Sequence, residues 1–490
     1  MGFGARGPVG ALLGGCHPGR PRATRSGRAR ELLTELMPAL LAAFARQREP
    51  EAALARFDSL LNRLSAGVNF LSTLHRNPKL LDRMAGLLGA APQLADHLAR
   101  RPVALEGLLT GAAIEAQPLA SLPALVREAR DLDEALEAAR RLVTERNFEV
   151  DAALLEGAMD ADAAGLRRSA IADAAISALL PAVQADFARR FGKVADGGLA
   201  VIALGKLGGR EMLPASDLDL ILVYDHAEDA GGSEGGARSL APSEYFIRLA
   251  QQVVAALTAP GAEGRAYEVD MRLRPSGNKG PLAVRLSAFA RYHAEEAWTW
   301  ERMALSRARS VAGPAALCRR VTEVLREALT TPRDVAKVLE DARSMRARML
   351  RELPGDGPWD LKARPGGLVE VEFIAQALSV AHAPTDARLL RGTTREVLAA
   401  LGRAGLLEER EAATLIQAER LWRTLLALLR LTVGKLRDGA PPAPVEEALR
   451  RSAAMLVHHD LPDFAALTRV VEDHAGAVRA SFERRIGAPG

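Results

Sequence analysis

The period of the hydrophobic pattern changes between residues 198 and 225. Before this stretch, apolar residues recur three and four positions apart, which is typical of amphipathic helices. GLAVIALG (198–205) and DLDLILVYD (217–225) are instead short strand-like runs, and RAYEVDMRLRP (265–275) alternates like a third strand. After residue 281 the helical period returns. The sequence therefore predicts an α+β chain that is predominantly helical, with a small α/β island between two helical regions.

Glycine, proline and charge divide the chain further. Six arginines precede the first acid within residues 1–30, which predicts a disordered basic arm, with a transit-type leader as the alternative. A long helix is expected at 163–192, and the Gly/Ser-rich stretch 227–243 is expected to be a flexible insertion. The predicted segments are the arm (1–30), a helical linker-like domain (31–160), a domain that contains the island (161–330) and a C-terminal helical bundle (331–490).

Composition narrows the class of protein. The chain has 490 residues, 48% of them hydrophobic and 26% charged, with a net charge of +4. No apolar run approaches the ~20 residues that a membrane span needs. Two cysteines, Cys16 and Cys318, support no disulfide framework. The arginines are spread out and aromatic residues are few, which disfavours nucleic acid as a partner. We expect a soluble, cytoplasmic protein that does not bind a membrane.

Two aspartates stand one residue apart at the start of the second strand. Since alternate side chains of a strand share a face, Asp217 and Asp219 project together, about 6.5 Å apart along the strand. Asp270 in the third predicted strand adds another acid. Three carboxylates from two strands match the ligands that Mg²⁺ takes in sites for phosphoryl or nucleotidyl transfer. A solvated strand end is the plainer interpretation of the Asp-x-Asp pair alone.

Polar and basic groups near these acids in the sequence are suited to binding phosphate. If the third strand extends to 275, Arg272 and Arg274 share a face with Asp270. The Gly208-Gly209 pair can bring backbone N–H groups close to a phosphate. Further candidates for nucleotide contact are Lys206, Arg210 and Ser216. No Walker A motif is present. The order of the glycine pair, the two aspartates and the third acid favours a nucleotide site over a chance cluster.

Four longer stretches carry a resemblance to a known family. They are GKLGGREMLPASDLDLILVYD, YEVDMRLRPSGNKGPLAV, EEAWTWERMALSRARSVAG and LKARPGGLVEVEFIAQ. Together they resemble the motif series of the bacterial glutamine-synthetase adenylyltransferase/adenylyl-removing enzymes, members of the nucleotidyltransferase superfamily. The resemblance runs from about residue 27 to the end. RLRPSG and EEAWTWE are similar to the C-terminal, adenylylating half of that bifunctional family, and only one island is present here.

The resemblance implies a reaction and a set of roles. It implies a nucleotidyltransferase domain that transfers AMP from ATP to a tyrosine hydroxyl of glutamine synthetase and releases pyrophosphate. By motif match, two Mg²⁺ ions would be held by Asp217, Asp219 and Asp270. The triphosphate would be lined by Gly208, Gly209 and Ser216, with help from Arg272 and Arg274. PII signal protein is an implied regulatory partner, although no residue indicates where it would bind.

Other residues have a functional and a structural interpretation. Lys362 can reach a nucleotide phosphate, or it can belong to a packed loop whose following glutamates, Glu370 and Glu372, favour a helix N-terminus. Trp298 can stack on adenine or contact a partner, but an aromatic in a helical segment is more often core. The His458-His459 pair lacks the partners of a metal site.

Two alternatives to AMP transfer stay open. One is the reverse chemistry, in which phosphate removes AMP from modified glutamine synthetase with the same acids. The other is a non-catalytic helical module that binds glutamine synthetase or PII, because half of the usual bifunctional protein is absent from this chain. A longer reading frame with a second island would make the chain a fragment of the bifunctional enzyme.

Overall fold

The computed structural model describes most of the chain as two compact units. It covers residues 21–489 apart from 48, 65–66, 92–97, 99–120, 262–263, 435 and 437–439. Cys16 and residues 1–20 of the predicted basic arm lie outside the described residues, and a helix already begins at Gly27. One unit lies within 1–117, 147–161 and 424–469, and the other within 118–146, 162–423 and 470–490. Each is described by itself.

The first unit is helical throughout its described part. It contains η1 (Arg22–Thr24), α2 (Gly27–Ala45), α3 (Pro50–Arg63), α4 (Gly67–Arg76), α5 (Pro78–Ala90) and α21 (Ala443–Val457). Phe57 packs between Phe44 and Phe70, with ring centroids 5.5 and 6.4 Å away. These rings come from the apolar faces of three short amphipathic helices, so their burial holds the helices together.

The second unit contains the predicted island. Among the described residues, the strands of its main sheet lie in the order β5-β3-β2-β7, and β6 also pairs with β3. The strands are β2 (Gly198–Ala203), β3 (Leu218–Asp225), β5 (Val269–Asp270), β6 (Ala283–Arg285) and β7 (Arg309–Ala312). β2 lies antiparallel to both β3 and β7. β5 and β6 are both parallel to β3, the first beside its start and the second beside its end.

The first two predicted strands are confirmed, and the third is mostly wrong. β2 and β3 fall within 198–205 and 217–225, but only Val269 and Asp270 of 265–275 are strand. Every residue of β2 is buried, and so is every residue of β3 except Asp219 and Asp225. The sheet is therefore covered on both faces, and charge on β3 is confined to positions near its two ends.

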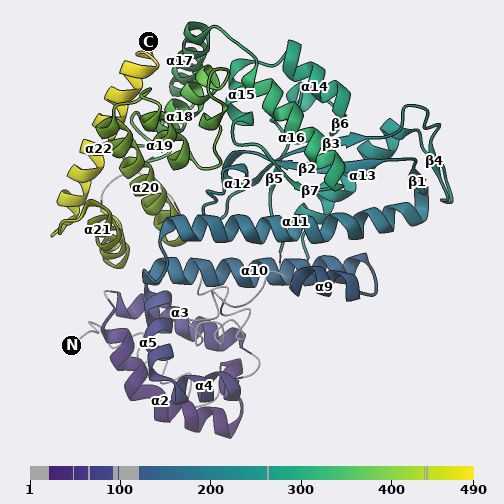
Figure 1. Cartoon of the computed structure of the whole chain (residues 1–490). Coiled ribbons are helices and arrows are strands. Elements are labelled where there is room, and N and C mark those ends of the chain that lie inside the picture. Colours follow the sequence, from purple (N-terminus) through teal and green to yellow (C-terminus); the bar gives the residue numbers. More distant parts are fainter. Residues whose placement is uncertain are drawn as a thin grey trace. The chain divides into compact units, whose positions relative to one another are not determined.

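The second unit also contains helices, several of which lie beside this sheet (Figure 1). They are α9 (Ser121–Glu128), α11 (Ala161–Phe191), α12 (Gly205–Gly208), α13 (Pro242–Thr258), α14 (Leu286–Glu295), α15 (Thr299–Leu305), α16 (Ala315–Thr330), α17 (Val335–Glu352), α18 (Leu368–His382) and α19 (Thr394–Arg403), with η2 (Gly277–Lys279) and η3 (Ala387–Leu389). α10 (Leu132–Glu156), α20 (Glu409–Thr432) and α22 (Phe464–Arg485) contribute residues to both units. The largely helical chain with small mixed sheets confirms the predicted fold class. The four predicted domain boundaries stay a prediction.

The Gly/Ser-rich stretch 227–243 was expected to be flexible, but it is held by hydrogen bonds. Its β4 (Ser233–Glu234) pairs antiparallel with β1 (Lys193–Val194). Ser233 accepts a hydrogen bond on Oγ from the N–H of Leu240 at 3.0 Å, and Ser239 donates to the Ser233 carbonyl at 2.7 Å. The segment therefore forms an anchored loop at the end of α11.

α11 confirms the long helix predicted at 163–192. By length and composition alone it is apolar enough to cross a membrane, but half of its most apolar window is buried in the protein. On one side it contacts the sheet, since Ser177 donates to the carbonyl of Val311 at 3.1 Å and Asp173 pairs with Arg309 at 2.8 Å. The buried half of its apolar window is thus packed within the protein, and polar contacts attach α11 to β7.

His293 of α14 makes the stability of the fold sensitive to acid. Its ring is 1% exposed beside Phe289 and Tyr292, and neither ring nitrogen has a partner among the described residues. Burial, and then the charge of Arg302, lower the pKa of His293 from 6.5 to about 4. Between pH 6.5 and 4 the unfolded chain therefore binds a proton at this residue that the folded chain does not bind. This difference lowers the free energy of unfolding by on the order of 3 kcal/mol at pH 4.

We expect His293→Leu to remove this part of the acid sensitivity. The melting temperature of the wild-type chain should fall more steeply than that of the variant as the pH is lowered from 7 to 4. The exposed His459 serves as a control, and His459→Leu should follow the wild-type curve. Parallel curves for wild type and His293→Leu would contradict the assignment.

Candidate active site

Asp219 of β3 is paired in register with Asp270 of β5. Adjacent strands run about 4.8 Å apart and paired residues of parallel strands point to the same face, so the two carboxylates lie close together. Burial raises the pKa of Asp219, and the negative charges of Asp217 and Asp270 raise it further, to about 6. The structure thus places Asp219 beside Asp270, and Asp217 is near enough for its charge to act on Asp219.

Asp217 and Ser216 precede β3. Asp217 is exposed and Asp219 is half-buried. Neither carboxylate has a hydrogen bond or ion pair among the described residues. Ser216 accepts a hydrogen bond on Oγ from the N–H of Leu213 at 3.1 Å, and its own N–H donates to the Leu213 carbonyl at 3.2 Å. Ser216 therefore closes the loop that leads into β3 and places the two acids at the start of the strand.

The arginines after Asp270 do not share its face. Because β5 ends at Asp270, the expected alternation stops there. Arg272 turns back on Asp270, donating from Nε to Oδ2 at 2.8 Å and from Nη2 to the same oxygen at 2.5 Å, and its N–H donates to Oδ1 at 2.8 Å. Arg274 is buried and donates to the carbonyls of Met271 at 2.7 Å and Gly280 at 3.3 Å. Arg274 organises the loop, and of these two arginines only the exposed Arg272 is hydrogen-bonded to Asp270, although the charge of Arg274 also lowers the pKa of Asp270.

No ready metal triad is formed by the described residues. Among them, no three His, Cys, Asp or Glu side chains are arranged to hold an ion. Both oxygens of Asp270 are engaged by Arg272. The donor set nevertheless fits a divalent cation in kind, because the mutually repelling carboxylates of Asp217 and Asp219 have no protein cation bonded to them. This is an arrangement that a bound cation would stabilise.

The glycine pair differs from the predicted phosphate cradle. Gly208 donates its N–H to the carbonyl of Leu204 at 2.7 Å, and Gly209 donates to Gly205 at 3.1 Å. These donors are therefore used within the turn that includes α12. A Cβ added at Gly208 would lie 2.4 Å from the carbonyl oxygen of Arg307, so close packing also demands glycine there. What the pair contributes in this structure is a tight turn beside Asp219.

Gly205 lies against the carboxylate of Asp219. Its φ is +53°, and an added Cβ would stand 1.9 Å from Oδ2 of Asp219. We expect Gly205→Ala to strain the backbone by about 1–2 kcal/mol and to displace the Asp219 carboxylate. The activity that the family resemblance implies should fall strongly, while the melting temperature should fall only modestly. The open position Gly231 is the control, and unaltered activity of Gly205→Ala would contradict the placement.

The two predicted lysines have different surroundings. The ammonium of Lys206 pairs with Glu372 of α18. Lys362 is exposed, and its ammonium has no bonded partner among the described residues, although its charge acts on both Asp219 and Glu372. Lys362 is therefore available to bind an anion, whereas Lys206 is engaged in an ion pair with Glu372.

A buried ion pair shapes the loop that carries Lys362. Arg346 of α17 donates from Nε to Glu370 at 2.9 Å and from Nη2 to the carbonyls of Ala363 and Arg364 at 2.9 and 3.1 Å. Glu370 also accepts from the N–H of Gly366 at 2.8 Å. The helix-start interpretation of Glu370 was therefore incomplete, since this glutamate fixes the loop through a partner that is distant in sequence.

Sequence reasoning missed Arg307 and Glu211. Arg307 donates from Nη1 to Glu211 at 3.2 Å and to Glu372 at 3.3 Å. Glu211 is fully buried and also accepts from the N–H of Thr394 at 2.5 Å and from its hydroxyl at 3.0 Å. The available signal was a set of charged residues inside the recognised motifs, but the partners of Arg307 lie 96 and 65 positions away from it in the sequence.

Trp298 contradicts the core interpretation of its segment. It is 70% exposed at the N-cap of α15, where its main-chain N–H donates to the Glu301 carboxylate at 2.8 Å. Trp300 is half-buried. The exposed indole is thus accessible to a ligand or a partner.

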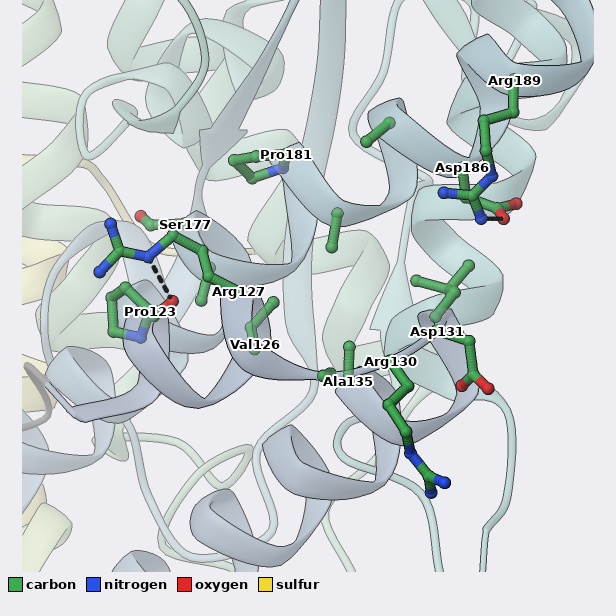
Figure 2. Close-up of a pocket in the computed structure, with 15 residues that line it drawn as sticks. Pro123, Val126, Arg127, Arg130, Asp131, Ala135, Ser177, Pro181, Asp186 and Arg189 are labelled. Atoms are coloured by element: carbon green, nitrogen blue, oxygen red, sulfur yellow. Dashed lines mark hydrogen bonds and ion pairs between the residues drawn. The ribbon is translucent and has the colours of Figure 1, made fainter.

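A pocket of about 410 Å³ lies elsewhere in the same unit, between α11 and the segment of α9 and α10. Figure 2 shows its charged rim, where Arg189 pairs with Asp186 at 2.5 Å and Arg127 donates to the carbonyl of Pro123 at 3.2 Å. It is lined by none of the predicted site residues. The pocket is therefore separate from the acidic cluster.

Comparison with known proteins identifies the family. The glutamate-ammonia ligase adenylyltransferase profile matches residues 81–324, and the GlnD PII-uridylyltransferase profile matches 336–485. The bifunctional glutamine synthetase adenylyltransferase/adenylyl-removing enzyme of Mesorhizobium japonicum is 42% identical across all of this chain. The enzymes of the same name from Brucella suis and Rhizobium meliloti are 42% and 38% identical, over 96% and 100% of it. The chain belongs to the glutamine synthetase adenylyltransferase family.

The family match confirms the resemblance, but it covers only about half the length of each of these relatives. The chain spans 50% of the Mesorhizobium and Rhizobium relatives and 48% of the Brucella one. It therefore corresponds to half of a bifunctional enzyme. That it is the C-terminal, adenylylating half stays a prediction from the wording of two motifs.

Proposed function

We propose that this chain transfers AMP from ATP to a tyrosine hydroxyl of glutamine synthetase. The observation that carries the proposal is the register pairing of Asp219 with Asp270, with Asp217 beside them, in a member of this family. The exposed Lys362 and the turn at Gly205 border the same cluster. A cluster of acids next to an unengaged cation suits a triphosphate that arrives with divalent metal.

The reaction is an in-line displacement. The tyrosine oxygen forms a bond to the α-phosphorus of ATP, the bond between that phosphorus and the bridging oxygen to the β-phosphate breaks, pyrophosphate leaves, and the tyrosine proton passes to solvent. Asp217 and Asp219 would hold Mg²⁺, with Asp270 as the third candidate once Arg272 releases it. Bound metal would supply charge neutralisation at the transferred phosphoryl group and activation of the attacking oxygen.

The nucleotide is proposed to contact the chain through few side chains. Lys362 would neutralise phosphate charge, and Arg272, 73% exposed in its side chain, could exchange its partner Asp270 for a phosphate oxygen. Gly208, Gly209 and Ser216 would shape the wall beside the triphosphate. A cytoplasmic location belongs to the same proposal, because ATP and glutamine synthetase are the proposed substrates.

The names of the relatives support a reverse reaction as the second candidate. These names include adenylyl removal, and this chain spans half the length of such a protein. The match of 336–485 to a PII-uridylyltransferase family supports PII as a partner of the C-terminal helices. The same acids would serve phosphorolysis, so only an assay of both directions separates the two activities.

The experiment is to incubate the purified chain with glutamine synthetase, α-labelled ATP and Mg²⁺. Label on the synthetase together with equimolar pyrophosphate supports transfer, and its loss with EDTA supports the metal assignment. Loss of AMP from pre-modified synthetase on addition of phosphate would instead reverse the direction. No change in either assay would overturn the catalytic proposal in favour of a binding module.

A further inference from the structure

We propose that Lys206, Glu372 and Arg307 are positioning residues that tie the turn beside Asp219 to helix α18, and that Lys206 does not bind the nucleotide. This inference rests on the proposed function, because the turn at 205–209 matters for catalysis only if Asp219 does. It assigns the phosphate-binding role among the two predicted lysines to Lys362 alone.

The ion pairs are the first observation. Lys206 lies in α12, and its ammonium contacts Oε1 of Glu372; the two side chains are 17% and 12% exposed. The same carboxylate oxygen accepts from Nη1 of Arg307 at 3.3 Å. Burial would raise the pKa of Glu372, but Lys206 and Arg307 outweigh it and lower the pKa to about 2. Glu372 is thus a fixed anion shared by two cations.

The charge balance of this cluster is the second observation. Arg307 is 9% exposed and also bonds Glu211, so two cations face two anions. With its amide oxygen toward Arg307, Gln376 of α18 accepts from Nη2 at 2.8 Å and from Nε at 3.2 Å. Every charge in the buried set is compensated within the protein. Moving Lys206 to a phosphate would break a buried ion pair, which is costly where water does not replace it.

The backbone contacts of the turn are the third observation. Gly208 is packed against the carbonyl of Arg307, and Gly209 lies against the Arg307 stem, with an ideal Cβ 3.1 Å from Cδ. Arg309, two positions after Arg307, donates to the carbonyls of Leu207 at 2.9 Å and Gly208 at 3.2 Å. Arg307 and Arg309 therefore hold the turn by its main chain, while Lys206 holds it by its side chain.

These contacts have a direct link to the acid. The N–H of Leu204, which enters the turn, donates to the carbonyl of Asp219 at 2.9 Å. Gly205 follows with its Cα against the Asp219 carboxylate. A shift of the turn would therefore be felt by Asp219. Misplacement of a reacting group by about 1 Å can lower a rate about 100-fold.

The test compares Lys206→Met, Glu372→Gln, their double variant and Lys362→Met in the full chain. ATP affinity is measured with Mg²⁺ by calorimetry, and kcat is measured by AMP transfer. We expect Lys206→Met and Glu372→Gln each to lower kcat about 10- to 100-fold, to change the Kd for ATP less than about threefold, and to be non-additive in the double variant. Lys362→Met should raise the Kd for ATP about tenfold or more.

Two controls separate positioning from folding. Lys206→Arg keeps a cation against Glu372 and should restore most of kcat, whereas loss of fold alone would lower the melting temperature without such rescue. Lys206→Met leaves Arg307 paired, so it keeps the test usable if Glu372→Gln does not fold. A tenfold rise in the ATP Kd for Lys206→Met, with additive effects in the double variant, would overturn the inference.

Failure of the proposed function would look different. A wild-type chain that binds ATP but transfers no AMP in either direction would contradict the proposed function. The inference would then be decided by the ATP affinities and by non-additive melting temperatures of Lys206→Met and Glu372→Gln. A wild-type chain that transfers AMP, with Lys206→Met losing ATP affinity, contradicts the inference alone.

Discussion

Asp219→Asn is expected to lower AMP transfer at least about 100-fold. The carboxylate lies at the centre of the acidic cluster and is replaced by a neutral side chain of the same shape. Because Asp219 has no bonded cation among the described residues and is repelled by Asp217 and Asp270, the substitution removes repulsion and breaks no pair. The melting temperature should therefore stay the same or rise while transfer is lost.

The control lies on the same strand. Asp225 ends β3 on the same face as Asp219, but it pairs with Arg320 at 2.6 Å and with Arg285 at 3.4 Å. Asp225→Asn should cost at most about 1 kcal/mol of stability and should keep its transfer activity. If Asp219→Asn retained near-wild-type transfer, the acidic cluster would not be the active site. Equal losses in both variants would indicate a structural effect of β3.

Glu370→Leu is expected to have the largest effect on stability. The Glu370 side chain is fully buried and accepts from Arg346, Arg479 and the N–H of Gly366. Its loss leaves the buried guanidinium of Arg346 with carbonyl partners only. Removing one partner of a buried pair costs roughly 3–5 kcal/mol. Thermal melting should show a large fall in the melting temperature.

A paired substitution tests the cause of that loss. Arg346→Met combined with Glu370→Leu removes both buried charges, so the double variant should be more stable than Glu370→Leu alone. If the double variant were less stable by the sum of two single losses, packing and not the uncompensated charge would explain the effect. Arg388→Met, which breaks an exposed pair with Asp386, should leave stability nearly unchanged.

Local patterns were sufficient to predict β2, β3 and α11. Each is a continuous apolar run or a helical repeat whose period is visible without its partners. The start of β3 could also be recognised as a site, because charged side chains on an otherwise buried strand are unfavourable unless another group compensates them. Alternation misled at 271–275, where Met271 and Leu273 continue the strand pattern. The Arg272 side chain pairs instead with Asp270, and Arg274 bonds main-chain carbonyls.

Long-range pairs could not be predicted from the sequence. Lys206 was assigned to the nucleotide because a lysine next to a glycine pair suggests phosphate. Its actual partner, Glu372, is 166 positions away, and no periodicity links the two. The same holds for Arg307 and Glu211, 96 positions apart. Electrostatic compensation depends on which side chains the fold brings together, and a single sequence does not contain that information.

The pairing of β3 with strands from three parts of the chain also orders the events of folding. β2 and β3 are close in sequence and can form an antiparallel pair early, whereas β5 joins β3 only after a loop of about 50 residues closes. Asp219 therefore meets Asp270 late. In a chain emerging from the ribosome, β2 can therefore pair with β3 before β5 brings Asp270 to Asp219 as the third acid of the cluster.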